Sequence, residues 1–229
     1  KEVVESVVYY TVINRITTNI TERTFASWCS EIRRITSAES LDAFVARAVI
    51  PTVTSWKQDN QSNFMRLGLN SMQQYRIKFI LGKITAYVDA LRQGTSTVRD
   101  VTPYVQSTVE IEHIMPQTCY DKGQYGLSEE EYPVYLNRLG NLTLLENSIN
   151  KSIQNEGYEA KAKAYKQSKF YLTSALSELT DQGSQTAINR TNKILRAWTA
   201  WDKGSIEDRQ LLLYELSERI WSITKKQES

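Results

Sequence analysis

Apolar residues recur at helical spacing through most of the first hundred positions. Three- and four-residue intervals, typical of a helix with one buried face, dominate the first run: Val4, Val7, Val8, Val12 and Ile16. A second run follows Thr36-x-x-Glu39, which has the pattern of a capping box, and we expect Pro51 to end it. A third covers residues 71–92 and stops at Gly94. This part of the chain is therefore predicted to be helical.

The repeat changes in the middle of the chain. Over 109–112 apolar residues alternate with glutamates, as in a half-buried strand, before Pro116 interrupts the ladder. A second short strand is expected over 139–145, and Ser128-x-x-Glu131 predicts a short helix between the two. The pattern of two strands and a following helix is that of a ββα unit.

Helical spacing returns after this segment. We expect helices over 149–154, 158–168 and 187–201, and a last one that begins at Ser205-x-x-Asp208. The buried face of the last helix is formed by five apolar residues: Leu212, Leu213, Leu216, Ile220 and Trp221. The predicted fold is mainly α, a helical bundle in two parts that flanks a small ββα insert.

Composition narrows the class of protein only slightly. The 229 residues are 41% hydrophobic and carry a net charge of +2, so total charge gives no argument for a nucleic-acid partner. No stretch approaches the roughly 20 apolar residues of a membrane span, so no membrane partner is expected.

The chain lacks an initiator Met and a signal peptide, which we interpret as a piece of a longer cytoplasmic protein. Cys29 and Cys119 have no CxxC partners, which excludes a zinc ribbon.

His113 is the only histidine, and Glu112 stands directly before it. For acid–base chemistry near neutral pH, His113 is the ordinary candidate, although a lone histidine is also common as a structural residue. Hydrolysis of a phosphodiester needs such a base together with a cation. Glu112 and an amide or carboxylate of the following helix would hold one Mg²⁺ or Mn²⁺. Strict alternation places Glu112 and His113 on opposite faces, so the strand must end or bend there, as Pro116 allows.

Three motifs follow one another in the middle of the chain: Glu112-His113-Ile114-Met115-Pro116-Gln117, Asn137-Arg138-Leu139-Gly140-Asn141-Leu142-Thr143-Leu144-Leu145, and Asn150-x-x-x-x-Asn155-x-x-Tyr158-x-x-Lys161. Together they resemble the carboxy-terminal nuclease domain of GmrSD-type restriction enzymes, which is an HNH, or His-Me finger, endonuclease domain. The resemblance covers roughly residues 107–221.

The resemblance implies a role for each matching residue. His113 would be the general base, and Asn141, the middle residue of the finger, would orient His113 or its strand. Glu112 and Asn150 would be the metal ligands, for Mg²⁺ or Mn²⁺. The interval of nine between Asn141 and Asn150 is also that of the HNH domains of RNA-guided CRISPR nucleases. The wider superfamily has Asp where Glu112 stands, and the longer side chain leaves open whether Glu112 coordinates the ion directly. For Asn141, a role in a turn, unrelated to chemistry, also stays open.

The resemblance also implies an organisation into domains. Residues 1–100 would be a helical subdomain that connects to an amino-terminal sensor or NTPase domain of the parent protein. Residues 101–229 would be the His-Me finger nuclease domain with its carboxy-terminal helices. The implied substrate is DNA, and the implied activity is that of a nickase from a restriction or phage-defence enzyme.

Lysines follow the third motif at helical spacing. Lys161, Lys163 and Lys166 could bind DNA phosphates, and an ordinary solvated helix face explains them equally well. Tyr158, Tyr165 and the pair Trp198 and Trp201 are expected in the core. A second function remains open from the sequence: a catalytically silent DNA-binding or protein-docking module that kept the finger fold.

Overall fold

Helices make up most of the computed structural model, which describes residues 2–181, 183 and 186–223. The mainly α class is thus confirmed. The chain divides into two units, Lys1–Met65 with Ser217–Ser229, and Arg66–Leu216. The long helix that precedes Gly94 falls in the second unit, where it contacts the second of the two strands.

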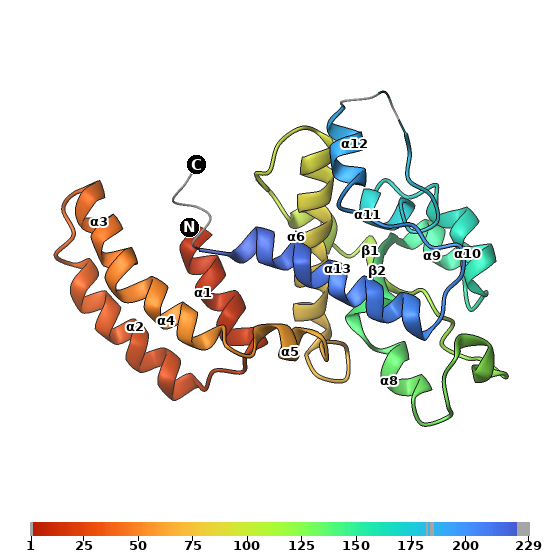
Figure 1. Ribbon diagram of the computed structural model, residues 1–229, viewed down its shortest axis with the longest axis horizontal. Helices are drawn as coiled ribbons and strands as arrows, with labels where there is room; N and C mark the ends of the chain where they lie inside the picture. Colours follow the sequence, from red (N-terminus) through yellow and green to blue (C-terminus); the bar gives the residue numbers. More distant parts are fainter. Residues whose placement is uncertain (1, 182, 184–185, 224–229) are drawn as a thin grey trace. The chain divides into compact units, whose positions relative to one another are not determined.

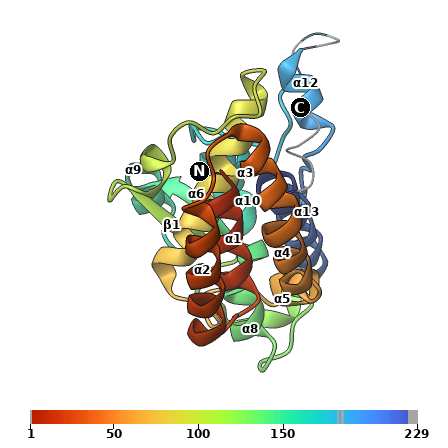
Figure 2. The same cartoon turned by 90° about the vertical axis from the view of Figure 1, so that its left-hand side faces the viewer.

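All helices and strands that the structure describes in the first unit are helices. Its elements are α1 (Glu2–Ile13), α2 (Thr18–Ile32), α3 (Ala38–Phe44), the π-helix η1 (Val45–Val49), α4 (Ile50–Trp56) and α5 (Asn60–Phe64), and the end of α13 returns to it. Figure 1 and Figure 2 show α2 beside the continuous run of α3, η1 and α4. Trp28 of α2 fills the space between them, against Phe44 and Trp56.

Two predicted boundaries in this unit are wrong. Pro51 does not end a helix but lies in the first turn of α4, where a missing N–H costs little. The π-helical turn directly before it keeps the chain helical up to the proline. The cap of α3 is Ser37 and not Thr36, because Ser37 and Ser40 exchange the two bonds of a capping box.

The second unit holds the strands. Its elements are α6 (Gln74–Arg92), α7 (Thr102–Val105), β1 (Val109–His113), the 3₁₀ helix η2 (Lys122–Tyr125), α8 (Tyr132–Leu136), the 3₁₀ helix η3 (Leu139–Asn141), β2 (Leu142–Glu146), α9 (Asn147–Ile153), α10 (Tyr158–Tyr165), α11 (Tyr171–Ser174), α12 (Ala187–Asn192) and most of α13 (Lys203–Trp221). Figure 1 shows the strand pair between α6 on one side and α9 with α10 on the other.

The strands form one antiparallel pair in which Val109 is opposite Glu146 and His113 is opposite Leu142. Buried and exposed residues do not alternate along β1, since its buried residues are Val109 and Glu112. On β2 four consecutive residues are buried, because α6 and α11 cover one face and α9 packs against the pair. The core beside the hairpin is rich in aromatic residues: Tyr125, Tyr132, Tyr135, Tyr158, Tyr165 and Trp201.

Three further predictions concern the helices around the hairpin. The reciprocal bonds between Ser128 and Glu131 are present, at 3.1 and 3.2 Å, and confirm that capping box. The helix expected over 187–201 ends at Asn192. The last helix begins at Lys203, and the side chain of Asp202 accepts a bond from the Ser205 amide, so Asp202 and not Ser205 caps it. No helix among the described residues has the length and hydropathy to cross a membrane.

Candidate active site

The end of β1 and the helix after β2 enclose a polar cleft of about 560 Å³. Its lining residues are Glu112, His113, Gln117, Thr118, Asn150, Lys151, Gln154, Asn155 and Lys161. The structure therefore brings Glu112, His113 and Asn150 together on one cleft, although strict strand alternation separates the first two. The ladder ends at His113, and the chain turns away after it, so that neighbouring side chains reach the same space.

Glu112 lies at the inner end of this cleft and is only 5% exposed. Its Oε1 accepts hydrogen bonds from Lys161 Nζ at 2.7 Å and from Tyr165 Oη at 3.1 Å. Lys161 Nζ also donates to the main-chain carbonyl of His113 at 2.6 Å. Burial raises the pKa of Glu112, and the ammonium of Lys161 opposes that rise. A buried cation thus ties the carboxylate and the backbone of the neighbouring histidine into one unit.

His113 is held through one ring nitrogen. Its side chain hydrogen-bonds Asn137, whereas Nε2 is buried without a partner in the described structure. Because Nε2 has no partner and the amide nitrogen of Asn137 donates to Pro133 O at 2.9 Å, we infer that Nδ1–H is the donor and the Asn137 amide oxygen the acceptor of this bond. Burial lowers the pKa of His113, and Lys161 lowers it further, while Asn137 opposes both. This arrangement favours a neutral ring with its lone pair on Nε2.

Asn141 is fully buried and lies behind the histidine and not in the cleft. Its Oδ1 accepts bonds from the Met115 amide at 2.8 Å and from Trp201 Nε1 at 2.9 Å, and its main-chain carbonyl accepts from the Ile114 amide at 2.9 Å. Both residues that follow His113 are therefore tied to Asn141. Its geometry is that of a residue that orients the end of β1.

Arg209 of α13 hydrogen-bonds the segment that carries Asn141. Arg209 is completely buried, and its Nη1 donates to the carbonyls of Gly140 at 2.8 Å and Leu142 at 2.7 Å, on either side of Asn141. Burial lowers the pKa of Arg209 to about 10. Gly140 permits this approach, because a Cβ there would lie 2.2 Å from Ile206 O. Arg209 is part of the Ile206-x-x-Arg209 pattern that fits the tail of the family, but its contact with these carbonyls, some 70 residues earlier, was not predicted.

Asn150 lies on α9 and is oriented by a residue of β1. Its Nδ2 donates to Glu110 Oε2 at 2.6 Å, and Asn147 donates to the other oxygen of the same carboxylate at 2.9 Å. Because the nitrogen of the Asn150 amide is bound to Glu110, the oxygen is the atom of this side chain left to bind a ligand. Glu110 was not predicted as a site residue, and the only signal for it was its place two residues before Glu112 on the same strand.

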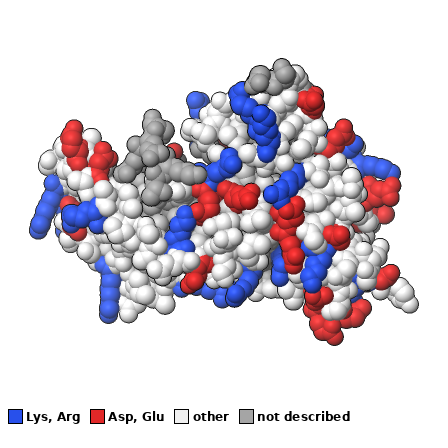
Figure 3. Space-filling model, in the orientation of Figure 1, with Lys and Arg blue, Asp and Glu red and all other residues white. Residues whose placement is uncertain are grey.

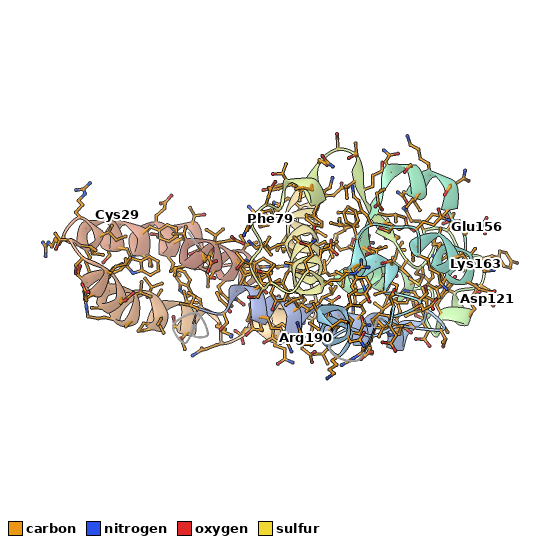
Figure 4. The ribbon with its side chains drawn as sticks, turned by 90° about the horizontal axis from the view of Figure 1, so that it is seen from above. Cys29, Phe79, Asp121, Glu156, Lys163 and Arg190 are labelled. Atoms are coloured by element: carbon orange, nitrogen blue, oxygen red, sulfur yellow. The ribbon has the colours of Figure 1, made fainter. Side chains whose placement is uncertain are left out.

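The predicted lysines do not form one surface. Lys161 is 1% exposed and paired with Glu112, whereas the side chains of Lys163 and Lys166 are 78% and 52% exposed. Lys163 lies at the outside of α10 in Figure 4 and contacts Glu159 at 3.8 Å, and Lys166 pairs with Glu178. On the face drawn in Figure 3, lysine and arginine alternate with acidic side chains over the second unit. Only Lys161 of the three lines the cleft.

The cleft offers oxygen donors suited to a hard cation. Glu112 supplies a carboxylate and Asn150 an amide oxygen, the donor types that Mg²⁺ and Mn²⁺ prefer. No group of three or more His, Cys, Asp or Glu residues with metal-binding geometry occurs in the described ranges. Two protein oxygens still fit magnesium, which keeps several water ligands and takes one or two carboxylates. The residues present thus fit such an ion.

The fold and this cleft define the class of the protein as a mainly helical domain with Glu112 and His113 at the end of a two-stranded antiparallel sheet, beside a polar cleft. The family model of the GmrSD restriction endonucleases, C-terminal domain, matches residues 57–216. The chain therefore belongs to this family, as the three motifs predict, and is the nuclease-type domain of a restriction enzyme. Comparison with curated proteins found no match.

Proposed function

We propose that this domain is an HNH-type, His-Me finger endonuclease that nicks DNA with the help of one divalent metal ion. The observation that supports it is the convergence of Glu112, His113 and Asn150 on one polar cleft, presented by two strands and the helix that follows them. Membership of a restriction-endonuclease family agrees with DNA as the substrate. The parent enzyme would supply a sensor or NTPase domain on the amino-terminal side.

His113 acts as the general base in this proposal. A water oxygen bonds to phosphorus while its proton passes to Nε2, and the bond from phosphorus to the leaving oxygen breaks. The bond from Nδ1–H to Asn137 keeps the ring in the tautomer that can accept this proton. Glu112 and Asn150 would hold Mg²⁺ or Mn²⁺. When bound, that ion supplies positive charge that stabilises the phosphoryl and leaving oxygens.

The rate of nicking should depend on pH through His113. The base works when neutral, and burial holds its pKa below the ordinary value of 6.5. The rate should therefore rise with pH, and the midpoint of that rise should lie below pH 6.5. A pH series of kcat/KM at saturating Mg²⁺ measures this. A midpoint clearly above 6.5 would contradict the environment described for His113.

Loss of either metal ligand should change the metal dependence. Glu112→Ala and Asn150→Ala each remove one oxygen donor, so a higher Mg²⁺ concentration should be needed for half-maximal nicking, with partial recovery in Mn²⁺. Titrations of activity against each metal measure the shift. Asn147→Ala is the matched control, because Asn147 bonds the same Glu110 carboxylate but does not line the cleft. Wild-type behaviour of Glu112→Ala at low Mg²⁺ would remove Glu112 from the metal site.

The proposed function itself is tested on supercoiled plasmid. The chain should convert it to the open circular form in Mg²⁺ or Mn²⁺, and a chelator should stop the reaction. One base and one metal serve one strand, so nicks should precede double-strand breaks, and ATP or GTP should not change the rate. The alternative, a silent DNA-binding or docking module, predicts no conversion in either metal. It is the weaker proposal, because such a module needs no unpartnered histidine nitrogen beside a buried carboxylate.

A further inference from the structure

The turn that ends α9 has an unfavourable backbone. Gln154 has φ 41° and ψ −127°, and the Glu156 amide bonds Ile153 O at 3.1 Å across it. These are the features of a type II′ turn with Gln154 at its second position, where glycine is the preferred residue. Among the described residues only Arg15 and Gln154 have positive φ without being glycine. A long amide side chain thus occupies a position that suits glycine.

The rest of the structure holds this turn in place. Asn155, the next residue, accepts a bond from the Thr118 amide at 3.0 Å and donates to the Thr118 carbonyl at 2.6 Å. These two bonds join the end of α9 to the segment that follows β1, and Thr118, Gln154 and Asn155 all line the cleft. Glu156, the last residue of the turn, lies at the surface in Figure 4. Strain of this kind persists where the surroundings over-determine it, and it clusters at binding sites.

The cleft wall formed by this turn is suited to an anion. It consists of Gln117, Thr118, Lys151, Gln154 and Asn155, which are neutral amides and a hydroxyl together with one ammonium. Among the described residues that line the cleft, the only acidic side chain is Glu112, which is paired with Lys161. Amide nitrogens donate hydrogen bonds to phosphate oxygens and do not distinguish one base sequence from another.

We propose that Gln154 is a DNA-contacting residue, whose amide nitrogen donates to a phosphate of the strand that lies in the cleft. Gln154 supplies the contact, and the pairing of Asn155 with Thr118 positions the turn that presents it. The contact explains why glutamine occupies a strained position on this wall. The inference rests on the proposed function for the identity of the strand, but it concerns binding and not hydrolysis.

Two substitutions of Gln154 separate the effect of the strained backbone from the effect of the side-chain amide. Gln154→Gly removes the amide and relieves the strain, so Tm should rise by roughly 2–4 °C while DNA affinity falls about tenfold. Gln154→Ala removes the amide and keeps the strain, so affinity should fall equally without a rise in Tm. Gln167→Ala is the matched control, since Gln167 is exposed after α10 and outside the cleft, and both quantities should stay at wild-type values.

DNA affinity is measured by fluorescence anisotropy with labelled duplexes of different sequence, in the presence of EDTA so that no cleavage occurs. An equal loss on every duplex supports a phosphate contact. A loss confined to adenine-rich duplexes would overturn it in favour of base-edge recognition, which a glutamine amide also performs. Wild-type affinity of either variant, or an unchanged Tm of Gln154→Gly, would overturn the inference as well.

Failure of the proposed function gives a different result. If the chain does not nick plasmid in any metal while both Gln154 variants bind duplex DNA more weakly, the hydrolytic mechanism is wrong and the contact stands. If the chain nicks plasmid and both variants bind DNA as the wild type does, the mechanism stands and the assignment of Gln154 is wrong.

Discussion

Replacement of His113 by Ala is expected to lower the rate of plasmid nicking by about 10²- to 10⁴-fold, the usual contribution of a general base. The fold should survive, because the ring is only partly buried and its Nε2 forms no bond that the substitution would break. Nicking assays together with circular dichroism and thermal melting measure both halves of this prediction.

Asn137→Ala is the companion variant. It removes the bond at Nδ1 that raises the pKa of His113, so the midpoint of the pH profile should move down and the plateau should fall because the ring is no longer oriented. A variant with only a structural defect would not move the midpoint. Nicking by His113→Ala within about threefold of the wild-type rate would remove His113 from the mechanism.

Replacement of Lys161 by Met should lower the free energy of unfolding by about 3–5 kcal/mol, the usual cost of breaking a buried ion pair from one side. The Lys161 and Glu112 side chains are 2% and 7% exposed, so the remaining carboxylate would be buried without a cation. Methionine keeps most of the volume of the lysine stem, which limits the contribution of a cavity. Urea denaturation followed by circular dichroism measures the change.

The control variant is Lys163→Met, two residues away on the same helix. Its side chain is 78% exposed and contacts Glu159 at 3.8 Å, a surface pair that should leave stability nearly unchanged. The double variant Glu112→Gln with Lys161→Met should be more stable than Lys161→Met alone, because it removes the uncompensated charge. A loss below about 1 kcal/mol in Lys161→Met would mean that water solvates the Glu112 carboxylate.

Lys161 shows where sequence reasoning fails. At helical spacing with Lys163 and Lys166 it has the pattern of a solvated or phosphate-binding face, and its interior position depends on Glu112, which lies 49 residues earlier. Spacing along a helix shows which residues share a face, but not which residue of another element meets that face. The same limit applies to Arg209, whose target carbonyls lie on a segment that α13 reaches only in the folded chain.

Local chemistry is predicted far better. The sequence alone indicated the presence of two strands, the helix after them, the capping box at Ser128, the family and the candidate residues His113, Asn141, Glu112 and Asn150, since turn residues, capping patterns and motif spacing are properties of neighbouring positions. Burial on the strands does not alternate, and residues 139–141 of the second expected strand form the 3₁₀ helix η3. Only the tertiary structure decided where these residues lie relative to one another and which contacts they form. It placed Asn141 behind the histidine, bound Asn150 to Glu110 and buried Lys161 against Glu112. Such pairings depend on distances between elements remote in the chain, which packing alone sets.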